Sequence, residues 1–470
     1  SPADTVMLSA GLRAVAPFGI DLMPRGGGMS YTSGYIGDGA DALVVDTSAM
    51  DRILHIEEVD MTVTVEAGCS WAALYAALKP RGLRTPAWGS LSGIKASVGG
   101  GMSQNGLFWG GGSSTMAPSC LSMQVVLADG TIMRTGNAIT RPSGPDVTGL
   151  FTADCGAFAI KAEVTLPLVR EGTAFAYGSF GFAGADTCFA AMSEVGRAGL
   201  ASECFGFDPF LQAQRMKRDS LSSDAKALAT MMKAQGGFWK AVKAGARVVA
   251  AGRSFLDDSN FSVHFICEGR HQAAVDADMA AISAICAAQG GVMVENTIPK
   301  ILRANPFPPV NSMVGPNGER WVPVHGIVAH SRAPATIDAI TALFTAHEDA
   351  MERLGVGAGY MFLTVGRTGF LIEPVFYWPD ALDAIHHASV EPAHMAKLVD
   401  FPANAAARAL VDALRAGVID IFRAADGVHF QVGRAYPLKA ASDPAAWTLL
   451  GAIKDHLDPD RRVNPGVLGL

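Results

Sequence analysis

The sequence predicts an α+β protein of more than one domain, and three observations support this class. The chain has 470 residues, enough for two or three domains at roughly 150 residues each. Its 52 glycines are concentrated in the first third, among short strands and tight turns. After Pro167, strands alternate with long alanine-rich helices. We therefore expect one domain over 1–168, a second over 169–440, and a C-terminal segment over 441–470.

The first domain is expected to consist of short elements separated by glycine turns. Residues 61–68 alternate between apolar and polar side chains, which is typical of a half-buried strand. Ser70 precedes an apolar run and is a favourable helix N-cap. The Asp129-Gly130 pair predicts a hairpin turn. The expected elements are a helix over 4–14, strands over 42–46 and 61–68, a helix over 71–78, and paired strands over 122–127 and 131–134.

The second domain is expected to have a mostly antiparallel sheet flanked by helices, because its strand candidates are interleaved with longer helical stretches. Asn464-Pro465-Gly466 predicts a rigid turn at the end of the chain. The expected strands are 175–182, 204–210, 261–267, 321–329, 360–365 and 370–378, and the expected helices are 270–289, 335–354, 403–418 and 447–457.

Composition and charge exclude several classes of protein. Only 17% of residues are charged, which is too few for a disordered chain, and the net charge of −7 makes nucleic acid an unexpected partner. The seven cysteines form no CxxC pair, so neither a disulfide framework nor a zinc ribbon is expected. The chain starts at Ser1 without an initiator Met, with no signal peptide and no apolar run of the ~20 residues that span a bilayer. We expect a cytoplasmic protein with reduced thiols and no metal site.

One stretch departs from this acidic average. Residues 215–253 contain nine Lys and Arg against Asp219 and Asp224, interleaved with apolar residues at roughly helical spacing. A basic amphipathic helix can contact an anionic membrane surface or an acidic redox partner. An ordinary solvated helix is the alternative. The oligomeric state is left open.

Two glycine clusters are the clearest chemical signal. The first runs from Arg25 to Ser30 and the second from Ser97 to Gly106. Consecutive glycines allow positive φ and can direct several N–H groups at one point, which suits phosphate oxygens. Neither a P-loop nor a GxSxG motif is present, and Tyr31 stands where the Rossmann fingerprint needs its third glycine. Two such nests suit a pyrophosphate, whereas two ligand-free turns are the alternative.

The order of further motifs resembles the FAD-binding domain of the vanillyl-alcohol oxidase / PCMH flavoprotein superfamily. The resemblance implies a two-part PCMH-type FAD-binding domain, a cap domain whose antiparallel sheet lies over the flavin, and a C-terminal segment that returns to the FAD-binding domain. The family's first strand is not found before the first loop, so it lies upstream or is replaced. The motifs are Arg25–Tyr31, Val63–Gly68, Ser97–Gly100, Met123–Gly130, Gly149–Ile160 and Leu457–Gly466.

The resemblance also implies which residues hold FAD. Met29 stands where family members often carry a His bonded to the flavin, and no cysteine lies between Cys69 and Cys120, so we expect non-covalent FAD. A bond to a histidine of the cap domain is the alternative. The implied pyrophosphate contacts are Arg25, Gly26, Gly27, Gly28, Met29 and Ser30. Ser97, Val98, Gly99, Gly100, Ser103, Asn105 and Gly106 are implied beside the pyrophosphate and the isoalloxazine, Gly156 and Ile160 near the adenine, and Asn464 near the flavin ring.

Catalytic candidates come from polar residues on predicted strands. If 429–436 is a strand, Arg434 and Tyr436 share one face, and this pair resembles the phenolate-binding pair of the phenol-oxidising members. His429 lies on the same segment. His325 and His330 would lie on opposite faces of a strand, which disfavours a shared metal. The catalytic candidates are Arg434, Tyr436, His429, His325 and Tyr377, and structural roles for each are the alternative.

The resemblance implies an FAD-dependent oxidoreductase. Our leading hypothesis is oxidation of an alcohol or benzylic C–H of a small apolar or aromatic molecule by hydride transfer to flavin N5. One alternative is a 2-hydroxy acid dehydrogenase, with Arg434 or Arg367 holding the carboxylate; the absence of an HxGDGN motif disfavours it. Another is a flavin subunit of an electron-transfer complex. The electron acceptor (oxygen, a quinone or a cytochrome) is left open.

Overall fold

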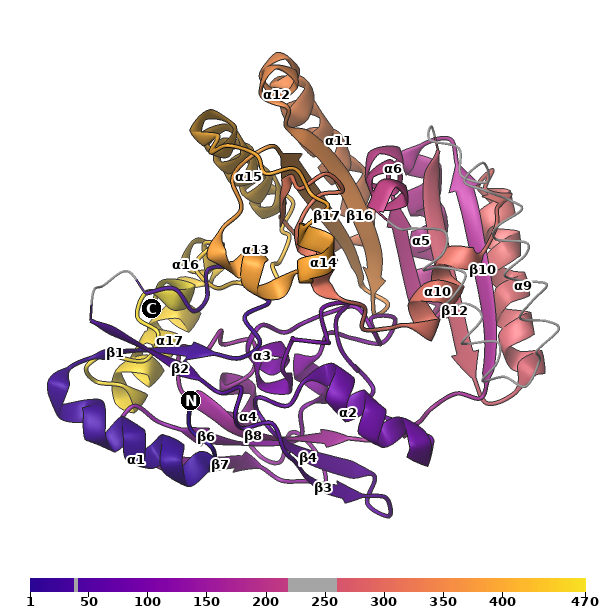
Figure 1. The fold of residues 1–470 in the computed structure, drawn as a ribbon. Helices are drawn as coiled ribbons and strands as arrows, with labels where there is room; N and C mark the ends of the chain where they lie inside the picture. The colour runs from indigo at the N-terminus through magenta and orange to yellow at the C-terminus, as the bar shows by residue number, and fades with distance from the viewer. Residues whose placement is uncertain (38–40, 219–259) are drawn as a thin grey trace. The chain divides into compact units, whose positions relative to one another are not determined.

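The structure is a computed structural model that describes residues 1–37, 41–218 and 260–470, so most of the basic stretch 215–253 lies outside the described residues. The chain divides into two compact units (Figure 1). Unit 1 comprises 1–110, 114–171 and 429–470, and unit 2 comprises 111–113 and 172–428. The chain therefore returns to unit 1 twelve residues before the predicted start of the C-terminal segment at 441.

Unit 1 contains a five-stranded antiparallel sheet in the order β3-β4-β8-β6-β7. The period-two pattern of β4 fits its position, because it pairs with a strand on each side. The hairpin predicted around Asp129-Gly130 is confirmed, since β6 and β7 pair in register across it. The strands are β3 Ile53–Glu57, β4 Thr62–Glu66, β6 Ser122–Val126, β7 Ile132–Gly136 and β8 Ile160–Pro167.

A second layer of unit 1 positions the first glycine cluster. Strand β1 (Asp21–Arg25) runs parallel to β2 (Ala42–Asp46), so the glycines that follow Arg25 leave from the end of a strand. The C-terminal tail pairs with the other edge of β1 through a parallel bridge between Leu22 and Val463. Helix α1 (Thr5–Val15) packs its leucines on this layer. The remaining elements of unit 1 include α2 Trp71–Leu78, α3 Val98–Ser103, α4 Val147–Leu150, α16 Leu438–Ala441, α17 Pro444–Leu457, and the paired β5 Leu83–Arg84 and β9 Val169–Arg170.

A buried ion pair fixes the tail beside β1. Lys454, near the end of α17, contacts Asp458 at 2.6 Å, and both side chains are buried. The Asp458 carboxylate also accepts hydrogen bonds from the backbone N–H groups of Arg462 and Val463. The Lys454 ammonium donates to the carbonyls of Ala157 and Val463. These contacts place Asn464 directly next to the strand that precedes the glycine loop.

Unit 2 is built on one sheet in the order β13-β10-β12-β11-β16-β17-β14, with β15 also paired to β17. All neighbouring strands are antiparallel, which confirms the predicted α+β class for this part of the chain. The strands are β10 Ala174–Phe182, β11 Glu203–Phe207, β12 Phe261–Gly269, β13 Val292–Met293, β14 Arg320–Pro323, β15 Gly326–Ala329, β16 Gly357–Val365 and β17 Gly369–Trp378.

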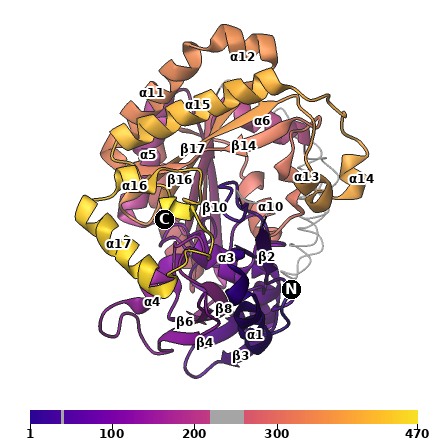
Figure 2. The ribbon, with the colours of Figure 1, turned by 90° about the vertical axis from the view of Figure 1, so that its left-hand side faces the viewer.

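The long helices of unit 2 cover one face of this sheet. A Cβ on Gly178 of β10 would lie 2.7 Å from Met279 of α9, and Phe189 of α5 packs against Phe362 of β16. Helix α11 packs along α15, as Figure 2 shows. The described helices of unit 2 are α5 Ala185–Ala198, α6 Pro209–Arg218, α9 Gln272–Ala288, α10 Thr297–Ala304, α11 Ala333–Thr345, α12 Glu348–Leu354, α13 Ala384–Ser389, α14 Pro392–Met395 and α15 Ala405–Ala424.

Two predictions in unit 2 were wrong in detail. The strand expected over 321–329 is interrupted after Pro323, because Val324 lies opposite Pro374, which has no N–H to return a ladder hydrogen bond. The helix expected over 335–354 is two helices. The second begins with Glu348 and Asp349 in its first turn, where acidic residues favour a new helix start.

The strand predicted over 429–436 is also wrong. Residues 433–435 form a turn, and Gly433 adopts a φ of +57°. A Cβ at this position would lie 2.2 Å from the hydroxyl oxygen of Thr32, so the segment bends where the chain packs against the first loop. Arg434 and Tyr436 therefore do not share a strand face, and sequence alternation does not describe this segment.

Candidate functional site

Arg25 and Tyr35 contact the first glycine cluster. The Arg25 guanidinium contacts Asp46 at 3.1 Å, and a Cβ on Gly28 would lie 2.7 Å from its Nη2. Gly28 has a φ of +70°, which favours glycine. The Tyr35 hydroxyl donates to the Gly28 carbonyl at 3.0 Å. Burial raises the pKa of Tyr35, although nearby Arg25 opposes this, so the phenol stays a donor.

The backbone N–H groups of this cluster are the strongest sign of a ligand. From Gly26 to Ser30, five consecutive N–H groups have no acceptor in the described part of the chain. Runs of such groups bind anions without needing a basic side chain. The sequence prediction of a phosphate nest at 26–28 is consistent with this geometry.

The second cluster is built differently from the prediction. It forms the short helix α3, and the N–H groups of Val98 and Gly99 donate to the carbonyls of Cys69 and Ala67, each at 2.8 Å. Ser97 caps the helix by accepting from Gly100 at 3.2 Å. None of Gly99, Gly100 and Gly101 has a positive φ. The expected nest at 99–101 is therefore wrong, because its N–H groups are already bonded within the protein.

The glycines instead allow the two clusters to touch. A Cβ on Gly26 would lie 2.3 Å from the Ser97 Oγ, and a Cβ on Gly27 only 1.8 Å from the Lys95 carbonyl oxygen. Similarly, a Cβ on Gly99 would lie 2.6 Å from Ala67. Contacts below 3.0 Å force the neighbour to move, and backbone cannot move cheaply. The residues around Gly26–Gly28 and Ser97–Gly101 thus form one continuous surface, which we call the glycine surface.

Asn464 connects this surface to the tail. Its side-chain amide donates to the carbonyls of Gly34 at 2.7 Å and Cys155 at 2.9 Å, and its Oδ1 accepts from Arg434 at 3.1 Å. Its φ of +47° is one that asparagine tolerates better than most residues. Arg434 also donates to the carbonyls of Ser33 and Pro465. The predicted Asn464 and Arg434 are therefore brought together, in contacts that hold loops in place.

The other predicted residues of unit 1 have varied contacts. The rings of His429 and Tyr436 stack with centroids 3.9 Å apart. The Ser103 carbonyl accepts from the Cys155 N–H, and the Asn105 side chain accepts from the Ala117 N–H at 3.0 Å. Ile160 begins β8 and is buried in the core beneath α1.

The loop 153–156, which belongs to the predicted motif Gly149–Ile160, lies next to Asn464. Ala153, Cys155 and Gly156 all have positive φ, and a Cβ on Gly156 would lie 3.3 Å from Pro24 at the end of β1. The Cys155 thiol accepts from the Gly433 N–H, and burial raises its pKa to about 11, so it is not a reactive thiolate. Asp154 in the same loop forms a buried ion pair with Lys161 at 2.6 Å.

The residues present fit FAD. The five unbonded N–H groups at Gly26–Ser30 can receive a pyrophosphate. The glycines around Ser97 leave a surface that side chains would fill. One carboxylate oxygen of Asp154 is buried without a donor in the described chain. The Arg25 guanidinium lies beside Gly28, and its partner Asp46 holds it in place.

Comparison with known proteins agrees with this assignment. Residues 1–136 match the family model described as FAD binding domain. The full chain overlays p-cresol methylhydroxylase with a TM-score of 0.68 at 15% identity, covering 100% of this chain and 88% of that one. For 4-ethylphenol oxidase from Gulosibacter chungangensis the TM-score is 0.66 at 17% identity, with the same coverage. The protein therefore has the fold of the vanillyl-alcohol oxidase / PCMH-type FAD-linked oxidases, and unit 1 carries an FAD-binding domain.

Curated relatives share a shorter region. The glycolate oxidase subunit GlcD of Bacillus subtilis is 29% identical over 177 residues, which is 36% of this chain and 36% of the relative. The probable mitochondrial D-lactate dehydrogenase of Danio rerio is 30% identical over 175 residues, 36% of this chain and 34% of the relative. The chain thus matches about a third of the length of these relatives.

Unit 2 brings two other predicted residues to one face of its sheet. In the β14/β15–β17 register, Trp321 is opposite Tyr377, and continuing this register places His325 opposite Glu373. By alternation these side chains lie on the side away from α5 and α9. His330 lies on the other side, near Gly196 of α5, as predicted for the two histidines.

A second histidine on the same face as His325 was not predicted. His264 of β12 is fully buried, and its Nδ1 lies 2.9 Å from the Ser179 hydroxyl. The Phe205 and Phe207 rings flank it, at centroid distances of 5.3 and 5.7 Å. We call the side carrying His264 and His325 the histidine face. A lone histidine in the apolar run 261–267 was the available signal.

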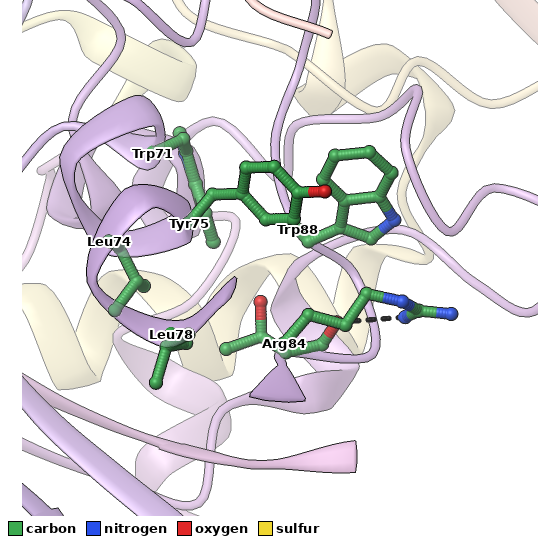
Figure 3. A pocket seen from close by; sticks show the side chains of 7 residues that line it. Trp71, Leu74, Tyr75, Leu78, Arg84 and Trp88 are labelled. Carbon is green, nitrogen blue, oxygen red and sulfur yellow. Dashed lines mark hydrogen bonds between the residues drawn. The ribbon is translucent and has the colours of Figure 1, made fainter. Parts of the chain in front are cut away.

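A separate shallow groove lies along α2. Trp71, Leu74 and Leu78 line it with Tyr75, whose ring stacks on Trp88 at 5.0 Å (Figure 3). Arg84 borders it and donates to the Thr85 carbonyl. Its lining is mixed, with Arg84 and Thr85 beside the apolar and aromatic side chains, and we assign it no role in the chemistry considered above.

Within 1–37, 41–218 and 260–470, no group of three or more His, Cys, Asp and Glu side chains is placed to hold a metal ion. Across the same part of the chain, no helix has the length and apolar character needed to cross a bilayer.

Proposed function

We propose that the protein is an FAD-dependent oxidoreductase that oxidises the alcohol carbon of a small apolar or aromatic molecule. The observation that carries this proposal is the run of five unbonded N–H groups at Gly26–Ser30, within a domain that matches an FAD binding domain. Bound FAD supplies the group that accepts a hydride. The chain must then bind the substrate and accept its hydroxyl proton.

The histidine face of unit 2 supplies groups for both tasks. Phe205 and Phe207 are buried rings that flank His264 and make the surroundings of its imidazole apolar. We assign the role of proton acceptor to His264, whose Nδ1 lies 2.9 Å from the Ser179 hydroxyl. His325 and Tyr377 on the same face are the second-rank candidates. These features favour an aromatic or apolar alcohol as substrate.

A 2-hydroxy acid is the second candidate, favoured by the names of the curated relatives. It requires a cation for the carboxylate. The Arg434 guanidinium already donates to Asn464 and to two carbonyls, which makes it a positioning group for the loops. Arg367 is the remaining predicted cation. The electron-transfer subunit, our third reading, rests on residues 215–253, outside the described ranges.

Anaerobic reduction of the bound flavin tests these readings. The FAD-loaded protein is mixed with a panel of aryl alcohols and a panel of 2-hydroxy acids, and loss of flavin absorbance is followed. We expect bleaching by aryl alcohols, slowed at least tenfold in His264→Gln, with exposed His387→Gln unchanged as the control. Bleaching by hydroxy acids alone supports the second candidate. No bleaching by either panel contradicts both and leaves the electron-transfer subunit.

A further inference from the structure

A buried ion pair lies beside the proposed FAD surface. Asp154 is 2% exposed and Lys161 is 4% exposed, and the Lys161 Nζ lies 2.6 Å from the Asp154 Oδ1. The Gly156 N–H donates to the same oxygen at 3.1 Å. Both donors from the protein are therefore on Oδ1.

The other oxygen of this carboxylate has no donor. Asp154 Oδ2 is shielded from solvent and has no hydrogen-bond partner among the described residues. Leaving such a group unbonded costs about 1–3 kcal/mol or more for a charged group. Glu66, a buried carboxylate of the same unit, has both oxygens bonded by Arg52. The contrast points to a partner for Asp154 that the protein chain does not supply.

The position of Asp154 indicates which partner. The next residue, Cys155, accepts from Asn464, whose amide also holds Gly34 of the first loop. Gly156 packs on Pro24, the residue before Arg25. Asp154 thus sits on a loop that is bonded directly to the elements of the glycine surface.

We propose that Asp154 Oδ2 accepts a hydrogen bond from a neutral O–H or N–H group of bound FAD. This inference rests on the proposed FAD site. The pyrophosphate itself is excluded, since it carries no proton to donate and a carboxylate repels it. The donors available on FAD are the ribose and ribityl hydroxyls, the adenine amino group and the flavin imide.

The direction in which Asp154→Asn changes FAD affinity distinguishes a hydrogen bond to FAD from a purely electrostatic effect of the carboxylate. Asp154→Asn keeps an oxygen for Lys161 and Gly156 but replaces the Oδ2 acceptor with an NH₂ donor. If Asp154 acted only through its charge, removing it would tighten binding of the anionic cofactor. If it accepts a hydrogen bond, binding weakens by about tenfold or more.

The measurement is the Kd of FAD for the FAD-stripped full chain, from quenching of flavin fluorescence. We expect Asp154→Asn to weaken FAD at least tenfold and Glu66→Gln to leave it unchanged. Circular dichroism of the stripped proteins checks folding, and Asp154→Ser replaces Asp154→Asn if that variant does not fold. Unchanged or tighter FAD binding by the variant overturns the proposal.

Binding of ADP and of FMN, which each represent one half of FAD, then shows which half carries the donor. If ADP binding weakens in Asp154→Asn and FMN binding does not, the donor is on the adenosine half. The opposite result places it on the ribityl or flavin half, and both results support the proposal. Equal binding of ADP and of FMN by wild type and variant contradicts it. Wild-type protein that binds no FAD would instead defeat the proposed function.

Discussion

Single residues decide whether the two glycine clusters can meet. Gly26 and Gly27 are required because Ser97 and the Lys95 carbonyl occupy the space a side chain would need. Gly28 alone in the first cluster is required for its backbone conformation. Asn464 is also required for its backbone conformation, because its φ is positive. In addition, its side chain makes three hydrogen bonds.

Gly27→Ala should weaken FAD binding strongly. Its Cβ would lie 1.8 Å from a backbone carbonyl oxygen, so the loop must separate from residues 95–97. We expect at least a hundredfold rise in the Kd of FAD, measured by fluorescence quenching. Gly11→Ala is the matched control, because nothing lies within 4 Å of its Cβ in α1, and there alanine should stabilise by about 0.5–1 kcal/mol. FAD binding by Gly27→Ala at wild-type affinity would contradict this role.

Asn464→Asp should destabilise unit 1. Aspartate tolerates the same φ and keeps the oxygen that accepts from Arg434. It loses both donors, and its second oxygen then faces the Gly34 and Cys155 carbonyls. We expect a loss of about 2–4 kcal/mol in the free energy of unfolding, measured with urea. A change below about 0.5 kcal/mol would show that these two bonds contribute little.

At the scale of elements, helices and turns that depend on neighbouring residues were predicted correctly. Interruptions caused by residues distant in the sequence were not. Helix α2 and the β6–β7 hairpin were predicted because an N-cap and a turn pair lie within the elements themselves. The strand over 321–329 is broken by Pro374, a residue on another strand. The segment 429–436 bends because Gly433 meets Thr32.

The same limit applies to the candidate site. The first glycine cluster was recognised from residue order alone, but the second became a helix whose N–H groups are used internally. Asp154 was missed because its partner Lys161 is seven residues away, on a strand that is otherwise apolar at its start. That lysine in an apolar strand was the available signal.

Asp208 connects two elements of unit 2 and should make stability depend on pH. Its Oδ1 accepts from Leu211 at the start of α6 and from Tyr360 of β16. Burial raises its pKa to about 6, although these N–H groups oppose the shift. The folded state holds this proton more tightly than the unfolded state does. The contribution of Asp208 to the free energy of unfolding therefore falls as pH rises from about 4 to 6.

Asp208→Asn removes that titration while keeping an acceptor oxygen. Relative to wild type, we expect the variant to gain about 2 kcal/mol in unfolding free energy between pH 4.5 and 7.5. Urea unfolding at both values measures the change. Exposed Asp338→Asn should show no such difference. A pH-independent gap between Asp208→Asn and wild type would remove Asp208 as the titrating group.

At the scale of the whole molecule, FAD should stabilise unit 1 selectively. The glycine surface, the 153–156 loop and the tail all belong to unit 1. A ligand that binds only the folded state raises its melting temperature. We expect removal of FAD to lower one calorimetric transition and re-addition to restore it, with no restoration in Gly27→Ala. An equal response in Gly27→Ala would place the stabilising site elsewhere.

The central claim is that unit 1 holds FAD without a covalent bond, through the N–H groups that follow Arg25. The most direct measurement is to load the purified chain with FAD, remove excess by desalting, and precipitate the protein with acid. We predict one flavin per chain, released entirely into the supernatant and identified as FAD by mass spectrometry. Flavin retained in the precipitate would contradict the non-covalent site, and a desalted protein without flavin would contradict the FAD site itself.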